Sequence, residues 1–170
     1  PANADADGTG DTIYLAAADR WGNMVSWINS NFSTWGSGIT VPGYGFMLHN
    51  RGGLFTLDPK SPNVIAGNKR PYNTLSAVLV MRNGAPLLVT GQHGGGEQGQ
   101  GNMQVLINVL DLGANMQAAG DMARFSHNQV RNELQMESQL FQLVGSALKN
   151  MGHKVVSSDG SPVGGFEGIM

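Results

Sequence analysis

The chain has 170 residues, a formal net charge of −2 and no cysteine. This length predicts one domain or a large part of one. The lysines and arginines are scattered, so the bulk charge gives no reason to expect nucleic acid or an anionic membrane as a partner. The absence of cysteine excludes disulfides, thiolate catalysis and cysteine-type zinc sites. No apolar run approaches the ~20 residues of a membrane-spanning helix.

The chain begins at Pro1, without an initiator methionine, and we expect it to be a piece of a longer polypeptide. Small polar residues dominate 1–11, which predicts a flexible leader. The apolar run over 12–18 is typical of a strand buried on both faces. Turn-forming residues follow at 19–23, and the pattern over residues 24–29 predicts a second strand. The two strands should therefore form a hairpin.

The middle of the chain has a different composition. Residues 30–76 are rich in Gly, Pro, Asn and Ser, and such a long irregular stretch inside a compact domain is usually functional. Asn83-Gly84 then indicates a tight hairpin turn. We expect strands at 77–81 and 86–90, helices at 103–110, 116–124 and 137–150, and closing strands at 153–157 and 163–169. This succession predicts a layered α+β domain.

Thr12 is the first candidate for chemistry. A threonine hydroxyl is a weak nucleophile unless a base lies beside it, and a free α-amino group on the same residue supplies one because its pKa is near neutrality. Such a group requires cleavage of the bond between Asp11 and Thr12, with the Thr12 hydroxyl attacking the preceding carbonyl. On these residues alone, an ordinary threonine at the edge of a strand is the commoner explanation.

The glycine cluster at 94–96 is the second candidate. A strand that runs into consecutive glycines presents backbone N–H groups without obstructing side chains, and such turns bind oxyanions or phosphates. The segment lacks the lysine of a P-loop and the Rossmann fingerprint. A strand-to-helix turn without function fits the same residues. His93 fits acid–base chemistry, although packing or hydrogen bonding is the more frequent role for such a histidine.

Residues 68–74 are the third candidate, with a basic pair, a proline-fixed turn and the polar pair Asn73 and Thr74. They fit the wall of a pocket for an anionic or amide substrate, and they fit a solvated loop equally well. The four histidines lie far apart in the sequence and lack a neighbouring ligand pattern, so we expect no metal site.

In their order along the chain, these segments resemble the small subunit of the γ-glutamyltranspeptidase family. The matching motifs are Asp11-Thr12 with Asp19 and Gly22-Asn23, Asn31-Phe32 with 36–39, then 41–45, 67–71, 89–91 with Gly94-Gly95, 104–111, 123–125 and 152–155. An ordered series is far more specific than any single motif. It favours Thr12 as a nucleophile over an ordinary strand residue.

The resemblance implies an α+β fold of the N-terminal-nucleophile (Ntn) hydrolase type. This fold is a four-layer αββα sandwich, of which 12–170 would be the C-terminal, small-subunit part. It also implies cleavage between Asp11 and Thr12, after which Thr12 is the nucleophile and its amine the general base. Gly94 and Gly95 would supply the oxyanion hole.

The resemblance further implies binding residues and partners. Ser30 or Asn31 would hydrogen-bond the nucleophile region, and Asn73 and Thr74 stand where the family places a serine pair that grips the substrate carboxylate. The implied partners are a large subunit from the same precursor, a small-molecule amide or peptide substrate, and water, an amino acid or a peptide as acceptor. No cofactor is implied, and a homodimer of such heterodimers fits the family. The compartment stays open, whether exported or cytoplasmic.

Two departures from the family pattern concern the substrate. Ile13 follows the nucleophile where the family has threonine, and Arg51-Gly52-Gly53-Leu54 replaces an acidic stretch that binds the substrate's α-amino group. Arg51 cannot replace a carboxylate that partners an ammonium, because buried like charges repel. We therefore expect an amidohydrolase that handles γ-glutamyl-glutathione chemistry poorly, with Arg51 favouring an acidic acyl group.

Two alternatives from other functional classes stay open. If the leader stays attached, the α-amine of Thr12 is blocked, and the chain belongs to an unprocessed, catalytically silent protein with a binding or structural role. An anion-binding module built on Gly94 and Gly95 is the other alternative, and it would bind phosphate without any cleavage at Thr12.

Overall fold

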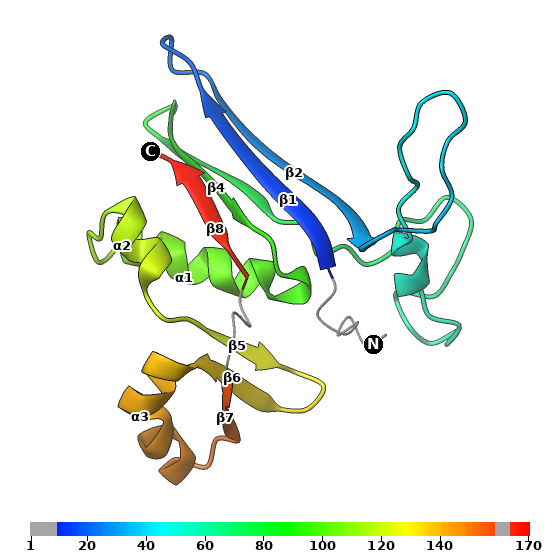
Figure 1. The fold of residues 1–170 in the computed structure, drawn as a ribbon. Coiled ribbons are helices and arrows are strands. Elements are labelled where there is room, and N and C mark those ends of the chain that lie inside the picture. The colour runs from blue at the N-terminus through cyan, green and yellow to red at the C-terminus, as the bar shows by residue number, and fades with distance from the viewer. Residues whose placement is uncertain (1–9, 159–163) are drawn as a thin grey trace.

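The computed structural model describes residues 10–158 and 164–170 of the chain. Two β-sheets are stacked on one another, and helices cover the outer face of one of them (Figure 1). The first sheet is an antiparallel pair, and the second contains three antiparallel strands. The first consists of β1 (Gly10–Ala18) and β2 (Met24–Ser33), and the second, in spatial order, of β3 (Ala77–Arg82), β4 (Ala85–Gln92) and β8 (Phe166–Ile169).

Two helices pack on the second sheet and close the hydrophobic core. Helix α1 (Gln98–Leu110) lies against β4, and helix α2 (Met116–Asp121) lies against β8. The core contains Leu88 of β4, Val105 of α1 and Ala119 of α2. Burying a large aliphatic side chain stabilises a fold by about 1.5–3 kcal/mol. The core therefore holds α1 at a fixed position on the sheet. The short 3₁₀ helix η2 (Gly95–Glu97) connects the glycine cluster to α1.

A smaller unit lies below these layers in Figure 1. In its sheet, β5 (Phe125–Asn128) and β6 (Glu133–Glu137) are antiparallel, whereas β6 and β7 (Val155–Ser158) are parallel. Helix α3 (Ser138–Asn150) makes the crossover between β6 and β7 and packs against both strands. A parallel pair requires a crossover of this kind.

A long irregular segment, residues 34–76, connects the two stacked sheets and extends to one side of them (Figure 1). It contains the short 3₁₀ helix η1 (Arg51–Leu54) and two isolated β-bridges, which join Thr40 to Met47 and Thr56 to Val64. We call residues 34–76 the connecting segment.

The predicted hairpins, the irregular middle of the chain and the three helices are confirmed, with different bounds at several ends. Between β3 and β4 the turn residues Asn83 and Gly84 have positive φ angles of 53° and 80°, as an Asn-Gly hairpin turn requires. Gly113 and Gly152, with φ angles of 73° and 95°, follow α1 and α3 as the sequence predicts.

Three elements differ from the prediction. Helix α1 begins at Gln98 and not at residue 103, because its first turns are held by buried polar side chains, Gln98 and Asn102, which bond to Ser76. Helix α2 ends at Asp121, before the predicted residue 124. Strands β5 and β6 were not predicted. Both are short and largely polar, so they are recognisable as strands mainly through their pairing with each other.

The strand that carries Thr12 is buried on one face and not on both as predicted. Tyr14 is 6% exposed, whereas Ile13 is 67% exposed. The alternation follows from the period of a strand, since one face packs on β4 and no described residue covers the other. The strand begins at Gly10, within the predicted leader, and leader residues 1–9 lie outside the described residues. The uncovered face of β1 and β2 carries Ile13, Leu15, Val25 and Trp27.

Candidate active site

Thr12 lies on β1 opposite a bulge in β2. The register pairs Asp11 with Phe32 and Thr12 with Ser30, so Asn31 is the extra residue of β2. A β-bulge re-aims the neighbouring side chains and is frequent beside active sites. Here Oγ1 of Thr12 donates a hydrogen bond to Oγ of Ser30 over 2.9 Å. Of the two residues that the sequence left open, Ser30 is the one that makes this side-chain contact.

The bulge is held in place by further hydrogen bonds. Oγ of Ser30 also accepts from the N–H of Phe32 over 2.9 Å, and Phe32 has a φ of 75°, which non-glycine residues rarely adopt. The N–H of Asn50 donates to the carbonyl of Asn31 over 3.1 Å. The Asn50 side chain accepts from the N–H of Ser33 over 3.1 Å and donates to its Oγ over 2.9 Å. The connecting segment therefore clamps the end of β2.

Tyr14 joins β1, the strand that carries Thr12, to β4. Its hydroxyl lies 2.8 Å from Oγ of Ser26, which donates to the carbonyl of Thr90 over 3.4 Å. The Tyr14 ring lies directly on Gly91, where any Cβ would collide with the ring. Burial raises the pKa of the Tyr14 hydroxyl. These contacts fix β1 relative to the strand that leads into the glycine cluster.

The glycine cluster forms the turn between β4 and α1. Gly94 and Gly95 have φ angles of 135° and 59°, and neither N–H makes a hydrogen bond within the described part of the chain. The N–H of His93 donates to the carbonyl of Gly165 over 3.2 Å, and the His93 ring packs against Gly165. This contact fits the packing alternative for His93. A Cβ on Gly164 would collide with the His93 carbonyl, so the backbone at Gly164 packs tightly against the start of the turn.

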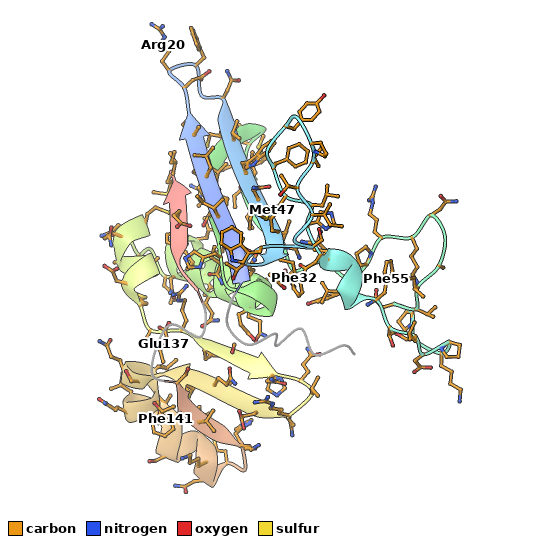
Figure 2. The ribbon with its side chains drawn as sticks, turned by 45° about the vertical axis from the view of Figure 1, so that its right-hand side comes forward. Arg20, Phe32, Met47, Phe55, Glu137 and Phe141 are labelled. Carbon is orange, nitrogen blue, oxygen red and sulfur yellow. The ribbon has the colours of Figure 1, made fainter. Side chains whose placement is uncertain are left out.

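A buried polar network lies beneath this turn. Arg124 is 6% exposed, and it donates to the carbonyl of Gly164 over 2.6 Å and to Oε1 of Gln92 over 3.3 Å. Glu137 accepts from the N–H of Arg124 over 2.7 Å and lies 3.6 Å from its guanidinium. Nε2 of Gln92 donates to the carbonyl of Glu97 over 3.2 Å. Figure 2 shows Glu137 where the smaller unit meets the layers above it.

Arg51 lies at the start of η1, beside the end of β2. Arg51 and Thr74 are 5% and 7% exposed, and Nη1 of Arg51 donates to Oγ1 of Thr74 over 3.0 Å. The guanidinium carbon lies 5.3 Å from the centre of the Phe32 ring, and Figure 2 shows Phe32 at the end of β2 next to η1. Burial lowers the pKa of Arg51, although a guanidinium stays charged in a protein. Asn73 is exposed, and its Oδ1 accepts from the N–H of Leu75 over 3.0 Å.

The structure brings the predicted residues together in two neighbouring contacts. Thr12 meets Ser30, and Arg51 meets Thr74. Phe32 connects the two contacts, because it pairs with Asp11, the residue before Thr12, and its ring lies over Arg51. The predicted oxyanion turn follows β4, on which β1, the strand that carries Thr12, packs.

Sequence reasoning missed the residues that hold these parts together. They are Tyr14, Gln92, Gln98, Asn102 and Arg124. Each has a polar group and is buried in the folded chain. Only two of them had a signal in the sequence: Tyr14 lies in the predicted buried strand over 12–18, and Arg124 lies in the motif at 123–125. Among the described residues, no group of His, Asp and Glu is arranged to hold a metal ion. Within the same ranges, no helix has the length and apolar character needed to cross a membrane.

The class of protein is defined by its layers and by the position of Thr12. Two sheets are stacked with helices on one side, and Thr12 lies on the first hairpin. This is the small-subunit part of the αββα sandwich of the Ntn hydrolases. The chain belongs to the γ-glutamyltranspeptidase family, since residues 1–170 match the family model described as gamma-glutamyltranspeptidase.

Individual relatives agree with this assignment. The glutathione hydrolase-like YwrD proenzyme of Bacillus subtilis is 33% identical over 160 residues, which cover 91% of this chain and 30% of that protein. The chain therefore spans about a third of the length of this relative. The cephalosporin acylase of Bacillus halodurans matches 90% of this chain and 28% of its own, with 39% identity and a TM-score of 0.83. A mutant of the γ-glutamyltranspeptidase of Helicobacter pylori matches 91% of this chain and 88% of its own, with 31% identity and a TM-score of 0.80.

Proposed function

We propose that this chain is the catalytic C-terminal part of a precursor that cleaves itself between Asp11 and Thr12. The processed enzyme then hydrolyses an amide, or transfers its acyl group, through an ester on Thr12. The observation that carries the proposal is the hydrogen bond from Oγ1 of Thr12 to Oγ of Ser30, placed at the bulge opposite the bond to be cut. Membership of the γ-glutamyltranspeptidase family supports the same proposal.

Self-cleavage follows from the position of Thr12 on β1. Oγ1 of Thr12 attacks the carbonyl carbon of Asp11, and the peptide bond breaks as the nitrogen of Thr12 takes up the proton. The resulting ester is hydrolysed by water, which leaves a carboxylate on Asp11 and a free α-amine on Thr12. The contact with Ser30 holds the hydroxyl in one orientation, which lowers the part of the activation free energy that comes from aligning it with the Asp11 carbonyl.

Turnover uses the group that cleavage exposes. The α-amine of Thr12 has a pKa near neutrality and accepts the hydroxyl proton as Oγ1 attacks the substrate amide. The N–H groups of Gly94 and Gly95 stabilise the oxyanion, and the proton passes to the departing amine. Water, an amino acid or a peptide amine then attacks the ester and releases the acyl group.

The proposal includes a large subunit from the same precursor. The uncovered face of β1 and β2 is apolar, with Ile13, Leu15 and Trp27 each more than half exposed. A contiguous apolar face of this kind marks an interaction surface. The B. subtilis relative is named a proenzyme, and most of its length lies beyond the part that this chain matches.

The first experiment is incubation of the full-length precursor, followed by intact mass measurement and N-terminal sequencing of the smaller fragment. A fragment that begins at Thr12 is the expected result, and the Thr12→Ala precursor should stay whole. Thr12→Ser is the matched control, because it keeps a hydroxyl and an α-amine at the same position. A folded wild-type precursor that stays uncut would contradict the proposal and favour the catalytically silent alternative.

Glutathione is the substrate in the name of the B. subtilis relative, but Arg51 makes us expect slow glutathione hydrolysis here. The guanidinium is buried, and it would repel the α-ammonium of a γ-glutamyl group. The test compares kcat/KM for glutathione with kcat/KM for amides without an α-ammonium. A rate for glutathione that equals or exceeds the others would contradict this expectation.

A further inference from the structure

Gln92 is a buried residue at the end of β4, directly before the glycine turn. Its side chain is 0% exposed, and it reaches past residues 93–96 to the far end of the turn. There Nε2 of Gln92 donates to the carbonyl of Glu97, the last residue of η2, over 3.2 Å. One side chain therefore joins the two ends of the turn that carries Gly94 and Gly95.

The orientation of the Gln92 amide is fixed by partners that can each play only one role. Nη1 of Arg124 donates to Oε1 of Gln92 over 3.3 Å, and a guanidinium has donors only. The carbonyl of Glu97 is an acceptor only, so Nε2 must face it. Arg124 is itself held by the carbonyl of Gly164 and by Glu137. Glutamine supplies an acceptor to one partner and a donor to the other, which neither glutamate nor methionine of similar size can do.

Close packing on α1 confines the Gln92 amide as well. A Cβ built on Gly101 would collide with both Nε2 and Oε1 of Gln92, so the amide lies directly on the backbone of the helix. Gly101 is buried at this contact. A Cβ on Gly99, two residues earlier in α1, would instead meet nothing within 4 Å. The amide is therefore enclosed by the helix, by Arg124 and by the far end of the turn.

The backbone of the turn does little to fix its own conformation. The N–H of Glu97 donates to the carbonyl of Gly94 over 3.2 Å, and the N–H of Gln98 donates to the carbonyl of Gly95. Gly94 and Gly95 have positive φ angles, and glycine has the widest backbone freedom of all residues. Donors that stabilise an oxyanion must nevertheless be held in place before the reaction. Such preorganisation comes from hydrogen bonds and packing that surround the donors.

We infer that Gln92 is a positioning residue for the proposed oxyanion hole. Its amide ties the far end of the turn to β4, and this restraint sets the direction of the Gly94 and Gly95 N–H groups. The inference rests on the proposed function, and it adds to the same site a buried residue that does not touch the substrate. Oxyanion donors act on charge that develops in the transition state. Loss of the restraint should therefore lower kcat and leave KM nearly unchanged.

The first test uses the processed enzyme, an acyl p-nitroanilide as substrate and a matched pair of substitutions. Gln92→Glu keeps an acceptor for Arg124 and replaces the donor to Glu97 by an oxygen. Gln104→Glu makes the same exchange further along α1, where Nε2 of Gln104 donates to the carbonyl of Phe125 over 2.8 Å and Oε1 accepts from its N–H over 3.0 Å. Gln92→Glu should lower kcat roughly 10- to 100-fold and keep KM within about 2-fold. Gln104→Glu should keep both values within about 2-fold, because it leaves the turn intact.

A second pair of substitutions displaces the amide without changing its chemistry, and it decides the question if Gln92→Glu does not fold. Gly101→Ala pushes the amide of Gln92 off the helix, whereas Gly99→Ala adds the same methyl group where nothing lies within 4 Å. We expect Gly101→Ala to lower kcat about 10-fold at nearly constant KM, and Gly99→Ala to keep the wild-type values. Equal kcat values in the two variants would overturn the inference and leave the proposed function intact. A raised KM at constant kcat in Gly101→Ala would overturn it as well.

Amide hydrogen exchange follows the turn itself and does not depend on turnover. The N–H groups of Glu97 and Gln98 are bonded within the turn, and they should exchange at least about 10-fold faster in Gln92→Glu than in Gln104→Glu. Equal exchange in the two variants would overturn the inference, and so would faster exchange with an unchanged kcat. A precursor that shows the expected difference in exchange but is never cut before Thr12 would uphold Gln92 as the restraint on the turn and contradict the proposed function.

Discussion

The stacked sheets and the connecting segment are held together in different ways. In the sheets, side chains join residues that are far apart in sequence, as where Oγ1 of Thr90 donates to the carbonyl of Glu167 over 3.1 Å. In the connecting segment, many contacts are local turns, as where the N–H of Lys60 donates to Oδ1 of Asp58 over 2.9 Å. The sheets carry Thr12 and the glycine turn, and the connecting segment carries Arg51. Buried long-range contacts fix geometry cooperatively, whereas surface segments tolerate change. We therefore expect the proposed chemistry at Thr12 to depend on the sheets, and the proposed recognition of the acyl group to depend on the connecting segment.

The largest expected effect concerns the network beneath the glycine turn. Arg124→Met should lower the free energy of unfolding by about 3–5 kcal/mol, because it removes the buried guanidinium that donates to the carbonyl of Gly164 and pairs with Glu137. Denaturant unfolding of the processed enzyme measures this loss. Lys154→Met is the control, since Lys154 is 61% exposed and pairs with Glu133 at the surface, where such a pair contributes about 0–1 kcal/mol. Equal losses would show that the network is no more important than the surface pair.

The packing of β1 on β4 gives the second prediction. Gly91→Ala should destabilise the protein by about 1–3 kcal/mol and reduce the cleaved fraction of the precursor, because the new Cβ collides with Tyr14. Gly99→Ala is the matched control, because it lies in α1, where a Cβ would meet nothing within 4 Å. A Gly91→Ala precursor that is cleaved as fast as Gly99→Ala would contradict the tight packing of the two strands.

A substitution of Ser30 tests its contact with Thr12, the proposed nucleophile. Ser30→Ala should slow cleavage before Thr12 about 10-fold, because the hydroxyl of Thr12 loses its hydrogen-bond partner. A time course of precursor mass measures the rate. Ser30→Thr should recover most of it, and Ser37→Ala in the connecting segment should leave it unchanged. Slow cleavage in Ser37→Ala would show that the two regions are not separable.

A substitution in the connecting segment should weaken substrate binding and leave the rate of cleavage before Thr12 unchanged. The side chain of Asn63 donates to the carbonyl of Leu54 over 2.6 Å and accepts from the N–H of Tyr72 over 3.0 Å. Asn63→Ala should loosen the end of η1 by about 1 kcal/mol and raise KM several-fold, while cleavage before Thr12 keeps its rate. Steady-state kinetics and the precursor time course check the two halves of this prediction. A variant that is cleaved slowly but binds substrate normally would reverse the assignment of roles.

The smallest expected effect is a change in the free energy of unfolding at alkaline pH. Burial raises the pKa of Tyr14 above its ordinary value of 10.0, so the folded protein keeps the phenolic proton at a pH where the unfolded chain releases it. The free energy of unfolding contributed by Tyr14 is therefore constant below pH 10.0 and falls as the pH rises from there through the folded pKa. Tyr14→Phe should show a smaller fall between about pH 9 and about pH 11 in urea unfolding. An unchanged fall would mean that Tyr14 ionises equally well in both states.

The sequence by itself determined the local elements and the family. The Asn83-Gly84 turn and the glycines after α1 and α3 are short-range signals that need no knowledge of the fold. The ordered motifs pointed to Thr12, to the glycine pair and to the substrate residues, and the family is confirmed. The catalytic and binding roles of these residues are still predictions.

Only the tertiary structure decided how these residues meet. The choice of Ser30 over Asn31 depends on a bulge, which is a property of strand pairing and not of composition. The burial of Arg51 against Thr74 joins positions that are far apart in the chain, and the same is true of Tyr14 on Gly91. Strands β5 and β6 and the first turns of α1 were missed for the same reason. A polar side chain becomes a buried partner only when a distant part of the chain covers it, and local sequence carries no record of that partner.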